Sequence, residues 1–178
     1  ICIEDEPKTH CNSVKLIEFL KKNTDKIKIG IRGEIATFVP ETTLKRNKGL
    51  DFILRSSDDY ALKKIIDAGF DDNRMKQIPN IAFCNTEGDI VLTEYQAIKY
   101  DLDSLPMPDR RLYDIDKYLN RDVETIVKSS RGCPGNCLFC IKTKFESFKV
   151  FSVQRFCDEI EELLDMGFQS FFISDDTF

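Results

Sequence analysis

Residues 129–140 read Ser-Ser-Arg-Gly-Cys-Pro-Gly-Asn-Cys-Leu-Phe-Cys, and this stretch decides how the chain is interpreted. It places three thiols, Cys133, Cys137 and Cys140, within eight residues. The preceding residues 124–128 predict a strand, so the thiols lie on a loop that follows it. Thiolates this close in a reducing compartment are poor disulfide partners and good ligands for a soft metal ion or an iron-sulfur cluster.

The spacing of the cysteines separates the possible kinds of metal site. A zinc ribbon or finger needs a second ligand pair. The sequence supplies none, because its one histidine, His10, lies far upstream. The four-cysteine ferredoxin order is also absent. Three thiolates on a four-iron cluster would leave one iron open to a substrate or cofactor. A noncatalytic iron-sulfur or zinc-binding module for electron transfer or assembly stays as the alternative.

The run Cys-x-x-x-Cys-x-x-Cys, with Phe139 just before its third cysteine, resembles the signature of the radical S-adenosylmethionine (radical SAM) superfamily. Three further stretches are similar to the subgroup with an N-terminal cobalamin (B12)-binding domain. They are Leu-Pro-Met-Pro-Asp-Arg at 105–110, Ser-Arg-Gly-Cys-Pro at 130–134 and Asp-Asp-Thr-Phe at 175–178. The resemblance is strong from about residue 102 onward and loose before it.

The resemblance implies both cofactors and a reaction. Cys133, Cys137 and Cys140 would hold a 4Fe-4S cluster whose open iron chelates S-adenosylmethionine, and cobalamin would bind upstream. An electron from an external flavodoxin- or ferredoxin-type donor would reach the cluster and cleave S-adenosylmethionine to methionine and a 5′-deoxyadenosyl radical. The radical would then start methylation, cyclisation or rearrangement of an unidentified small-molecule or peptide substrate.

The resemblance also assigns residues to the S-adenosylmethionine site. Phe139 would pack against the cofactor, and Asp175 or Asp176 would accept hydrogen bonds from its amino group, although many superfamily members have Gly-Gly-Glu there.

The predicted topology of the strands also favours a site at this position. The strands predicted at 124–128 and 169–173 are joined by a helix, so they should be parallel and end at one sheet edge. That edge carries the ligand site in α/β proteins. A helix cap or a solvated turn is the alternative for both aspartates.

The helix between these strands is the best-defined element of the sequence. Ser152 is its predicted N-cap and Gly167 its C′ residue. Apolar residues recur between them at i, i+3, i+4, i+7, i+10 and i+11. They are Val153, Phe156, Cys157, Ile160, Leu163 and Leu164.

The rest of the chain predicts an α/β fold in three parts. Residues 1–77 alternate predicted helices and strands, with a helix over Asn12–Asn23, and would be the C-terminal part of a Rossmann-like, cobalamin-binding-type domain. Residues 78–122 predict a hairpin and a proline-containing linker. Residues 123–178 would be the first β-α-β unit of a radical SAM partial (β/α) barrel. The chain begins at Ile1 and stops within this barrel, so a fragment of a longer protein is expected.

Composition limits the partners and the compartment. The 178 residues carry a net charge of −5 without a basic block, which argues against a nucleic-acid footprint. No apolar run approaches the roughly 20 residues that span a bilayer, and no signal peptide is visible, so a cytoplasmic protein is expected. The four cysteines outside the loop are predicted to be free thiols. They are Cys2, Cys11, Cys84 and Cys157.

The cobalamin prediction has no cobalt ligand in the sequence. Members that ligate cobalt through histidine use an Asp-x-His-x-x-Gly motif, and residues 8–13 do not supply it. We therefore expect His10 to be an ordinary surface or loop histidine. The sugar and nucleotide-like parts of cobalamin would instead lie near Gly30 and Gly33.

Overall fold

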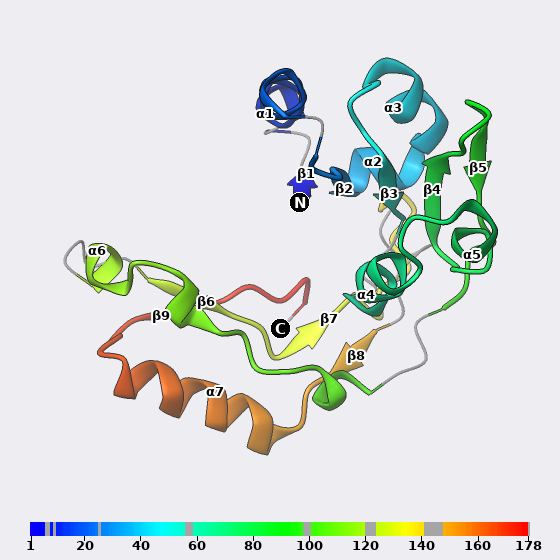
Figure 1. The fold of residues 1–178 in the computed structure, drawn as a ribbon. Helices are drawn as coiled ribbons and strands as arrows, with labels where there is room; N and C mark the ends of the chain where they lie inside the picture. Colours follow the sequence, from blue (N-terminus) through cyan, green and yellow to red (C-terminus); the bar gives the residue numbers. More distant parts are fainter. Residues whose placement is uncertain are drawn as a thin grey trace. The chain divides into compact units, whose positions relative to one another are not determined.

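The computed structural model describes residues 1–5, 8, 10–24, 26–55, 59–97, 101–119, 124–140 and 148–177. The chain forms two compact units, Ile1–Gln96 and Ala97–Phe178. Both contain helices and strands (Figure 1), which confirms the α/β fold class. Within the described ranges, none of the helices has the length and apolar character that a membrane crossing requires.

The first unit is built on a five-stranded sheet in the order β1-β2-β3-β4-β5. The first three strands are parallel, which confirms the predicted parallel sheet for β2 and β3, and β4 and β5 continue the sheet as an antiparallel hairpin. The hairpin that the sequence grouped with the linker therefore extends this sheet. The strands are β1 (Cys2–Asp5), β2 (Gly30–Gly33), β3 (Phe52–Leu54), β4 (Ile81–Cys84) and β5 (Ile90–Leu92).

Helices cover both faces of this sheet. Ile53 shares a buried cluster with Ile17 of α1 and Leu44 of α3. Its neighbour Phe52 belongs to a second cluster with Ile65 of α4. Successive side chains of a strand point to opposite faces, so the two clusters lie on either side of the sheet. The helices are α1 (His10–Asn23), α2 (Glu34–Phe38), α3 (Pro40–Arg46), α4 (Asp59–Asp67) and α5 (Asp72–Met75).

Three local features of the first unit differ from the prediction. Helix α1 begins at His10, two residues before the predicted start at Asn12. Strand β1 and helix α2 were not predicted at all. Helix α2 has five residues, including the β-branched Ile35 and Thr37, so it is too short for a helical period to show.

The second unit contains the predicted β-α-β motif. Strands β6 and β9 are parallel, and α7 lies between them in the chain. Ser152 caps α7 by accepting a hydrogen bond from the Arg155 N–H at 3.2 Å, and Gly167 has φ of 98° just after the C-cap. Both predicted ends of the helix are confirmed. The elements are η1 (Leu102–Ser104), η2 (Arg110–Leu112), α6 (Ile115–Leu119), β6 (Thr125–Val127), β7 (Ser130–Arg131), β8 (Lys149–Val150), α7 (Val153–Asp165) and β9 (Phe171–Ile173).

The linker packs against α7 as part of the second unit. Its side chains Leu102 and Leu105 are buried. The unit boundary follows Gln96, whereas the boundary predicted near residues 122 and 123 lies outside the described residues. Three polar contacts hold the linker: Asp103 Oδ1 accepts from Ser152 N–H at 3.0 Å, Pro106 O accepts from Arg155 Nη2 at 3.1 Å, and Arg110 pairs with Glu159 at 2.5 Å.

Candidate functional site

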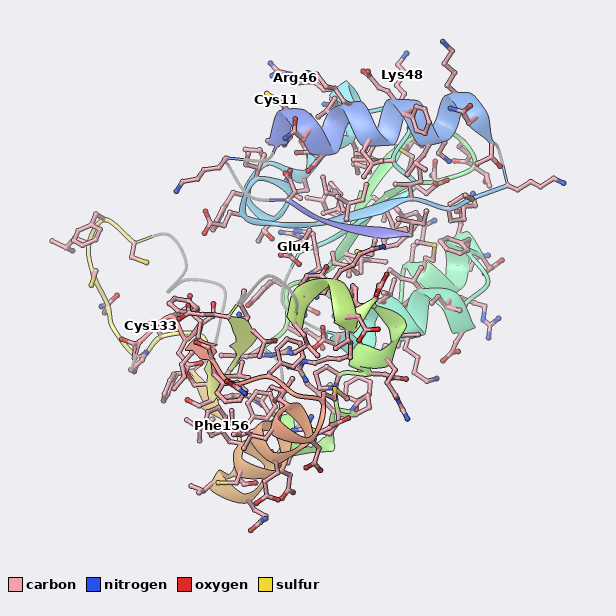
Figure 2. The ribbon with its side chains drawn as sticks, turned by 90° about the vertical axis from the view of Figure 1, so that its left-hand side faces the viewer. Glu4, Cys11, Arg46, Lys48, Cys133 and Phe156 are labelled. Atoms are coloured by element: carbon pink, nitrogen blue, oxygen red, sulfur yellow. The ribbon has the colours of Figure 1, made fainter. Side chains whose placement is uncertain are left out.

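The cysteine loop and Asp175 follow the same edge of the β6–β9 pair. Val127, the last residue of β6, is in register with Ile173, the last residue of β9. The parallel arrangement predicted from the sequence is therefore confirmed, and it brings the start of the loop to Asp175. Figure 2 shows Cys133 near the base of the loop, which continues outward from the second unit.

The base of the cysteine loop is closed by a short ladder. Strand β7 pairs antiparallel with β8, which lies beyond the cysteines in the chain. The Phe151 N–H also donates to the Ser129 carbonyl at 2.9 Å. Gly132 has φ of 76°, a conformation that glycine adopts without steric cost, and the chain turns there toward the first thiol.

Asp175 binds the two serines that precede the loop. Its Oδ1 accepts from the Ser129 N–H at 2.9 Å and from the Ser130 N–H at 3.1 Å. Its Oδ2 accepts from the Ser129 hydroxyl. Burial by itself would raise the pKa of Asp175, but these hydrogen bonds outweigh it and hold that pKa below its ordinary value. The ionised carboxylate therefore joins the end of β9 to the start of the loop.

The three thiols differ in exposure and in local contacts. Cys133 and Cys140 are half-buried, and Cys137 is exposed. The Gly135 N–H donates to the sulfur of Cys133 at 3.4 Å, and the Cys140 N–H donates to the Cys137 carbonyl at 3.0 Å. An N–H aimed at sulfur stabilises a thiolate, which is the form that binds metal.

Gly135 lies beside two of the three loop thiols. A Cβ atom placed on Gly135 would lie 3.3 Å from the sulfur of Cys133 and 3.9 Å from that of Cys137. A side chain there would crowd the Cys133 thiol and reach ordinary contact distance of the Cys137 thiol, and glycine keeps that space open. Three cysteines with an N–H to sulfur are a donor set suited to an iron-sulfur cluster. Among the described residues, no three His, Cys, Asp or Glu side chains are gathered closely enough to hold a metal ion.

The other residues assigned to the S-adenosylmethionine site are at the surface. Phe139 is 92% exposed on the loop, next to the fully exposed Leu138. Asp176 is also exposed, whereas its neighbour Asp175 is half-buried. The last residue of the Asp-Asp-Thr-Phe stretch, Phe178, lies outside the described residues. The roles of Phe139 and Asp176 stay predictions.

The four cysteines outside the loop are free thiols, as predicted. Cys11, Cys84 and Cys157 are exposed. Cys2 in β1 is half-buried, and burial raises the pKa of its thiol. Cys157, on α7 of the second unit, is an exposed thiol comparable with the exposed loop thiol Cys137.

The sequence missed a polar pair at the end of β1. His10 is the first residue of α1, and its Nδ1 lies 2.9 Å from Oδ2 of the fully buried Asp5. His10 is therefore a partly exposed helix residue, which agrees with the expectation of a surface histidine, but its buried carboxylate partner was not expected. Five residues separate the pair, which matches no local motif, and only the return of the chain from β1 into α1 brings them together.

Packing explains the two glycines that the sequence offered as cobalamin contacts. A Cβ atom on Gly30 would lie 2.2 Å from ring atoms of Phe52 in the neighbouring strand. A Cβ atom on Gly33, which has φ of 130°, would lie 1.8 Å from the Asp5 carbonyl oxygen. Both positions require glycine for the sheet itself, so a cobalamin contact there stays a prediction.

A pocket of about 470 Å³ lies in the second unit at the other end of β6. It includes the first residues of β6, whereas the cysteine loop follows the last ones, so it is separate from the loop. Its lining is mainly apolar and aromatic, with Arg110 and Glu124 as its charged residues. The lining residues are Arg110, Tyr113, Ile115, Tyr118, Glu124, Thr125, Ile126 and Phe168.

Comparisons with known proteins support the resemblance seen in the sequence. No family model matches the chain. An uncharacterized methyltransferase of Pyrococcus horikoshii is 27% identical over 162 residues, covering 89% of this chain and 35% of that protein. The cobalamin-dependent S-adenosylmethionine radical enzyme OxsB, solved with aqua-cobalamin and S-adenosylmethionine, matches with a TM-score of 0.77 and 20% identity. The match covers 99% of this chain and 25% of OxsB.

A second solved structure has the same fold. The radical S-adenosylmethionine methyltransferase TsrM of Kitasatospora setae, solved with cobalamin and a 4Fe-4S cluster, matches with a TM-score of 0.70 and 14% identity. The match covers 94% of this chain and 34% of TsrM. The chain thus spans about a third of its Pyrococcus relative and less of OxsB. Both solved neighbours are less than 25% identical to this chain, so these two likenesses show a shared fold.

Proposed function

We propose that the full-length protein is a cobalamin-dependent radical SAM enzyme that transfers a methyl group. The observation that carries the proposal is the three-cysteine loop at the sheet edge that β6 shares with β9. A loop of this composition at the carboxyl ends of parallel strands lies where α/β enzymes bind their cofactors. The fold of the solved neighbours and the methyltransferase name of the Pyrococcus relative support the same conclusion.

The proposal gives tasks to the three loop cysteines, to Gly135 and Phe139 of the loop, and to Asp176 after β9. Cys133, Cys137 and Cys140 would each bind one iron of the cluster as a thiolate. The Gly135 N–H would stabilise the thiolate of Cys133. Phe139 covers the cofactor and excludes water. The Asp176 carboxylate accepts a hydrogen bond from the amino group of S-adenosylmethionine. When bound, the reduced cluster would supply the electron that cleaves one S-adenosylmethionine to methionine and a 5′-deoxyadenosyl radical. Cobalamin would carry a methyl group taken from a second S-adenosylmethionine, which leaves as S-adenosylhomocysteine. A flavodoxin- or ferredoxin-type protein delivers the electron.

Anaerobic reconstitution of the full-length protein with iron and sulfide tests the proposal. We expect a brown protein with about four irons per loop and an electron paramagnetic resonance signal that changes when S-adenosylmethionine is added. Cys133→Ala should lose the iron, and Cys157→Ala, which removes an exposed thiol on α7, should retain it. An unchanged signal would contradict the enzyme, and a colourless protein retaining one zinc would favour a structural metal site.

The cobalamin part is tested separately. Full-length protein incubated with hydroxocobalamin and desalted should retain the visible absorption of the corrinoid at about one cofactor per chain. The Cys133→Ala protein should retain it equally, because the thiol lies in the second unit and cobalamin is expected on the first. Loss of the corrinoid from the desalted protein would contradict the claim that the protein binds cobalamin. It would not affect the claim that the loop binds an iron-sulfur cluster and S-adenosylmethionine.

A further inference from the structure

Backbone hydrogen bonds attach the base of the cysteine loop to the fold. Two residues of β7 pair with β8, and the Phe151 N–H binds the Ser129 carbonyl. Beyond Gly132 the chain reaches the surface, because Cys137 and the two apolar residues after it are exposed. The position of the thiols therefore depends on how firmly the residues just before Gly132 are held.

Asp175 gives those residues their contact with the other strand of the pair. Its carboxylate lies 46 residues away from Ser129 in sequence and accepts three hydrogen bonds from Ser129 and Ser130. Hydrogen bonds to a charged acceptor are stronger than neutral ones. The contact lies four residues before the first thiol and depends on a residue outside the loop.

We propose that Asp175 is a positioning residue that fixes the base of the cysteine loop and so presents the three thiols at the sheet edge. This inference rests on the proposed function, because it concerns the loop that would hold the cluster. It gives Asp175 a role exerted through Ser129 and Ser130, distinct from the direct contact with S-adenosylmethionine that the sequence suggested. Asp176 keeps that direct contact in the proposal.

Hydrogen exchange of the full-length protein, prepared without iron, tests the geometric part. Asp175→Ala should raise the exchange of a peptide spanning residues 128–133 by about 10-fold or more, because two backbone amides lose a charged acceptor. Asp175→Asn, which keeps one acceptor oxygen, should give a smaller increase. Peptides from α7 should exchange as in the wild type, which a general loss of stability would not allow. Asp165→Ala, an exposed carboxylate at the end of α7, is the matched control.

Iron retention tests the functional part on the same variants. After anaerobic reconstitution, the iron content should fall in the order wild type, Asp175→Asn, Asp175→Ala, and Asp165→Ala should match the wild type. If Asp175→Ala does not fold, Ser129→Ala replaces it, because it removes the hydroxyl donor and leaves both backbone amides in place.

Two results would overturn the inference. One is unchanged exchange at residues 128–133 in a folded Asp175→Ala protein, and the other is faster exchange with undiminished iron. Failure of the proposed function would give a different result. The wild type itself would then bind no iron, and Cys133→Ala would not change the iron content. In that case the exchange measurement alone decides whether Asp175 fixes the loop base.

Discussion

The five-stranded sheet of the first unit and the β6–β9 pair of the second differ in how their faces are covered. Ile53, at the centre of β3, is fully buried, and both its face and the opposite face of the sheet carry helices. In β6, Val127 is 1% exposed under α7, whereas its neighbour Ile126 is 59% exposed. Phe172 of β9, which is in register with Ile126, is 54% exposed.

This difference shows which apolar residues stabilise the described fold. Parallel strands in α/β proteins are normally covered on both faces. Every apolar position of β3 is explained by packing within the first unit, whereas Ile126 and Phe172 are not explained by packing within the second. The same contrast holds for polar residues. In the first unit, Gly30 and Gly33 pack closely against neighbouring strands of the sheet. The second unit carries a loop of three thiols, of which Cys137 is exposed and the other two are half-buried.

The largest expected effect tests this contrast with a matched pair of isoleucines. Ile53→Ala should lower the free energy of unfolding of the first unit by about 4 kcal/mol, because it leaves a cavity between packed layers. Ile126→Ala should cost less than about 1 kcal/mol in the second unit, because its side chain is already largely in water. Urea denaturation of the 178-residue chain measures both. Equal costs would show that the open face of β6 is covered in solution.

The next effect compares two glycines with positive φ. Gly33→Ala should destabilise the first unit by about 3 kcal/mol, because the new Cβ meets the Asp5 carbonyl 1.8 Å away and the backbone is strained. Gly167→Ala should cost about 1 kcal/mol, because the nearest atom to its Cβ, on Leu119, is 3.4 Å away and only the conformation is unfavourable.

Thermal unfolding distinguishes these two outcomes. The Gly33→Ala protein should unfold at a clearly lower temperature than the Gly167→Ala protein. A similar shift for both would mean that β1 moves away from β2 at little cost, and that the first unit is less tightly packed than its buried clusters indicate.

The third effect compares two ion pairs. Arg110 and Glu159 fix the linker to α7, and their side chains are 15% and 11% exposed. Glu159→Ala leaves the guanidinium without its partner and should destabilise the second unit by about 2 kcal/mol. The Lys63–Asp67 pair on α4 is exposed, so Asp67→Ala should change stability by less than about 0.5 kcal/mol.

Limited proteolysis gives an independent measurement of the third effect. Trypsin cleavage after Arg110 or Arg111 should be faster in Glu159→Ala than in the wild type, because the linker is released from α7. Asp67→Ala should leave that cleavage unchanged. A linker cut equally fast in all three proteins would contradict the assignment of residues 101–112 to the second unit.

Local signals account for what the sequence predicted correctly. Helix α7 was predicted with both ends because Ser152, Gly167 and the apolar period between them all lie within one short stretch. The parallel pairing of β6 and β9 followed from the connecting helix. The cysteine loop was recognised because metal binding by thiols depends on the spacing of the cysteines along the chain, and this spacing can be read from the sequence.

Contacts between distant residues account for what the sequence missed. The bonds from Ser129 to Asp175 span 46 residues, and no local pattern marks either partner. The two-residue strands β7 and β8 are too short for an alternation to show. Gly30 and Gly33 suggested a ligand site because the sequence does not show that Phe52 and the Asp5 carbonyl press against them.

The smallest expected effect concerns acid stability of the first unit. Burial by itself would raise the pKa of Asp51, but the Ile29 N–H and the ammonium groups of Lys21 and Lys28 hold it below its ordinary value. The ionised form is therefore favoured in the folded state. Its stabilisation is present above the unfolded pKa near 3.9 and is lost as pH falls through the lower folded value.

Asp51→Asn should therefore cost about 1 kcal/mol at pH 7 and progressively less as the pH falls below about 4. Urea denaturation at a series of pH values between 7 and 3 measures the difference from the wild type. Asp165→Asn, at an exposed carboxylate of the second unit, is the control for the loss of one negative charge. If the cost of Asp51→Asn were constant over this range, the contacts of Asp51 would not depend on its charge. The first unit would then be held at this point by packing alone.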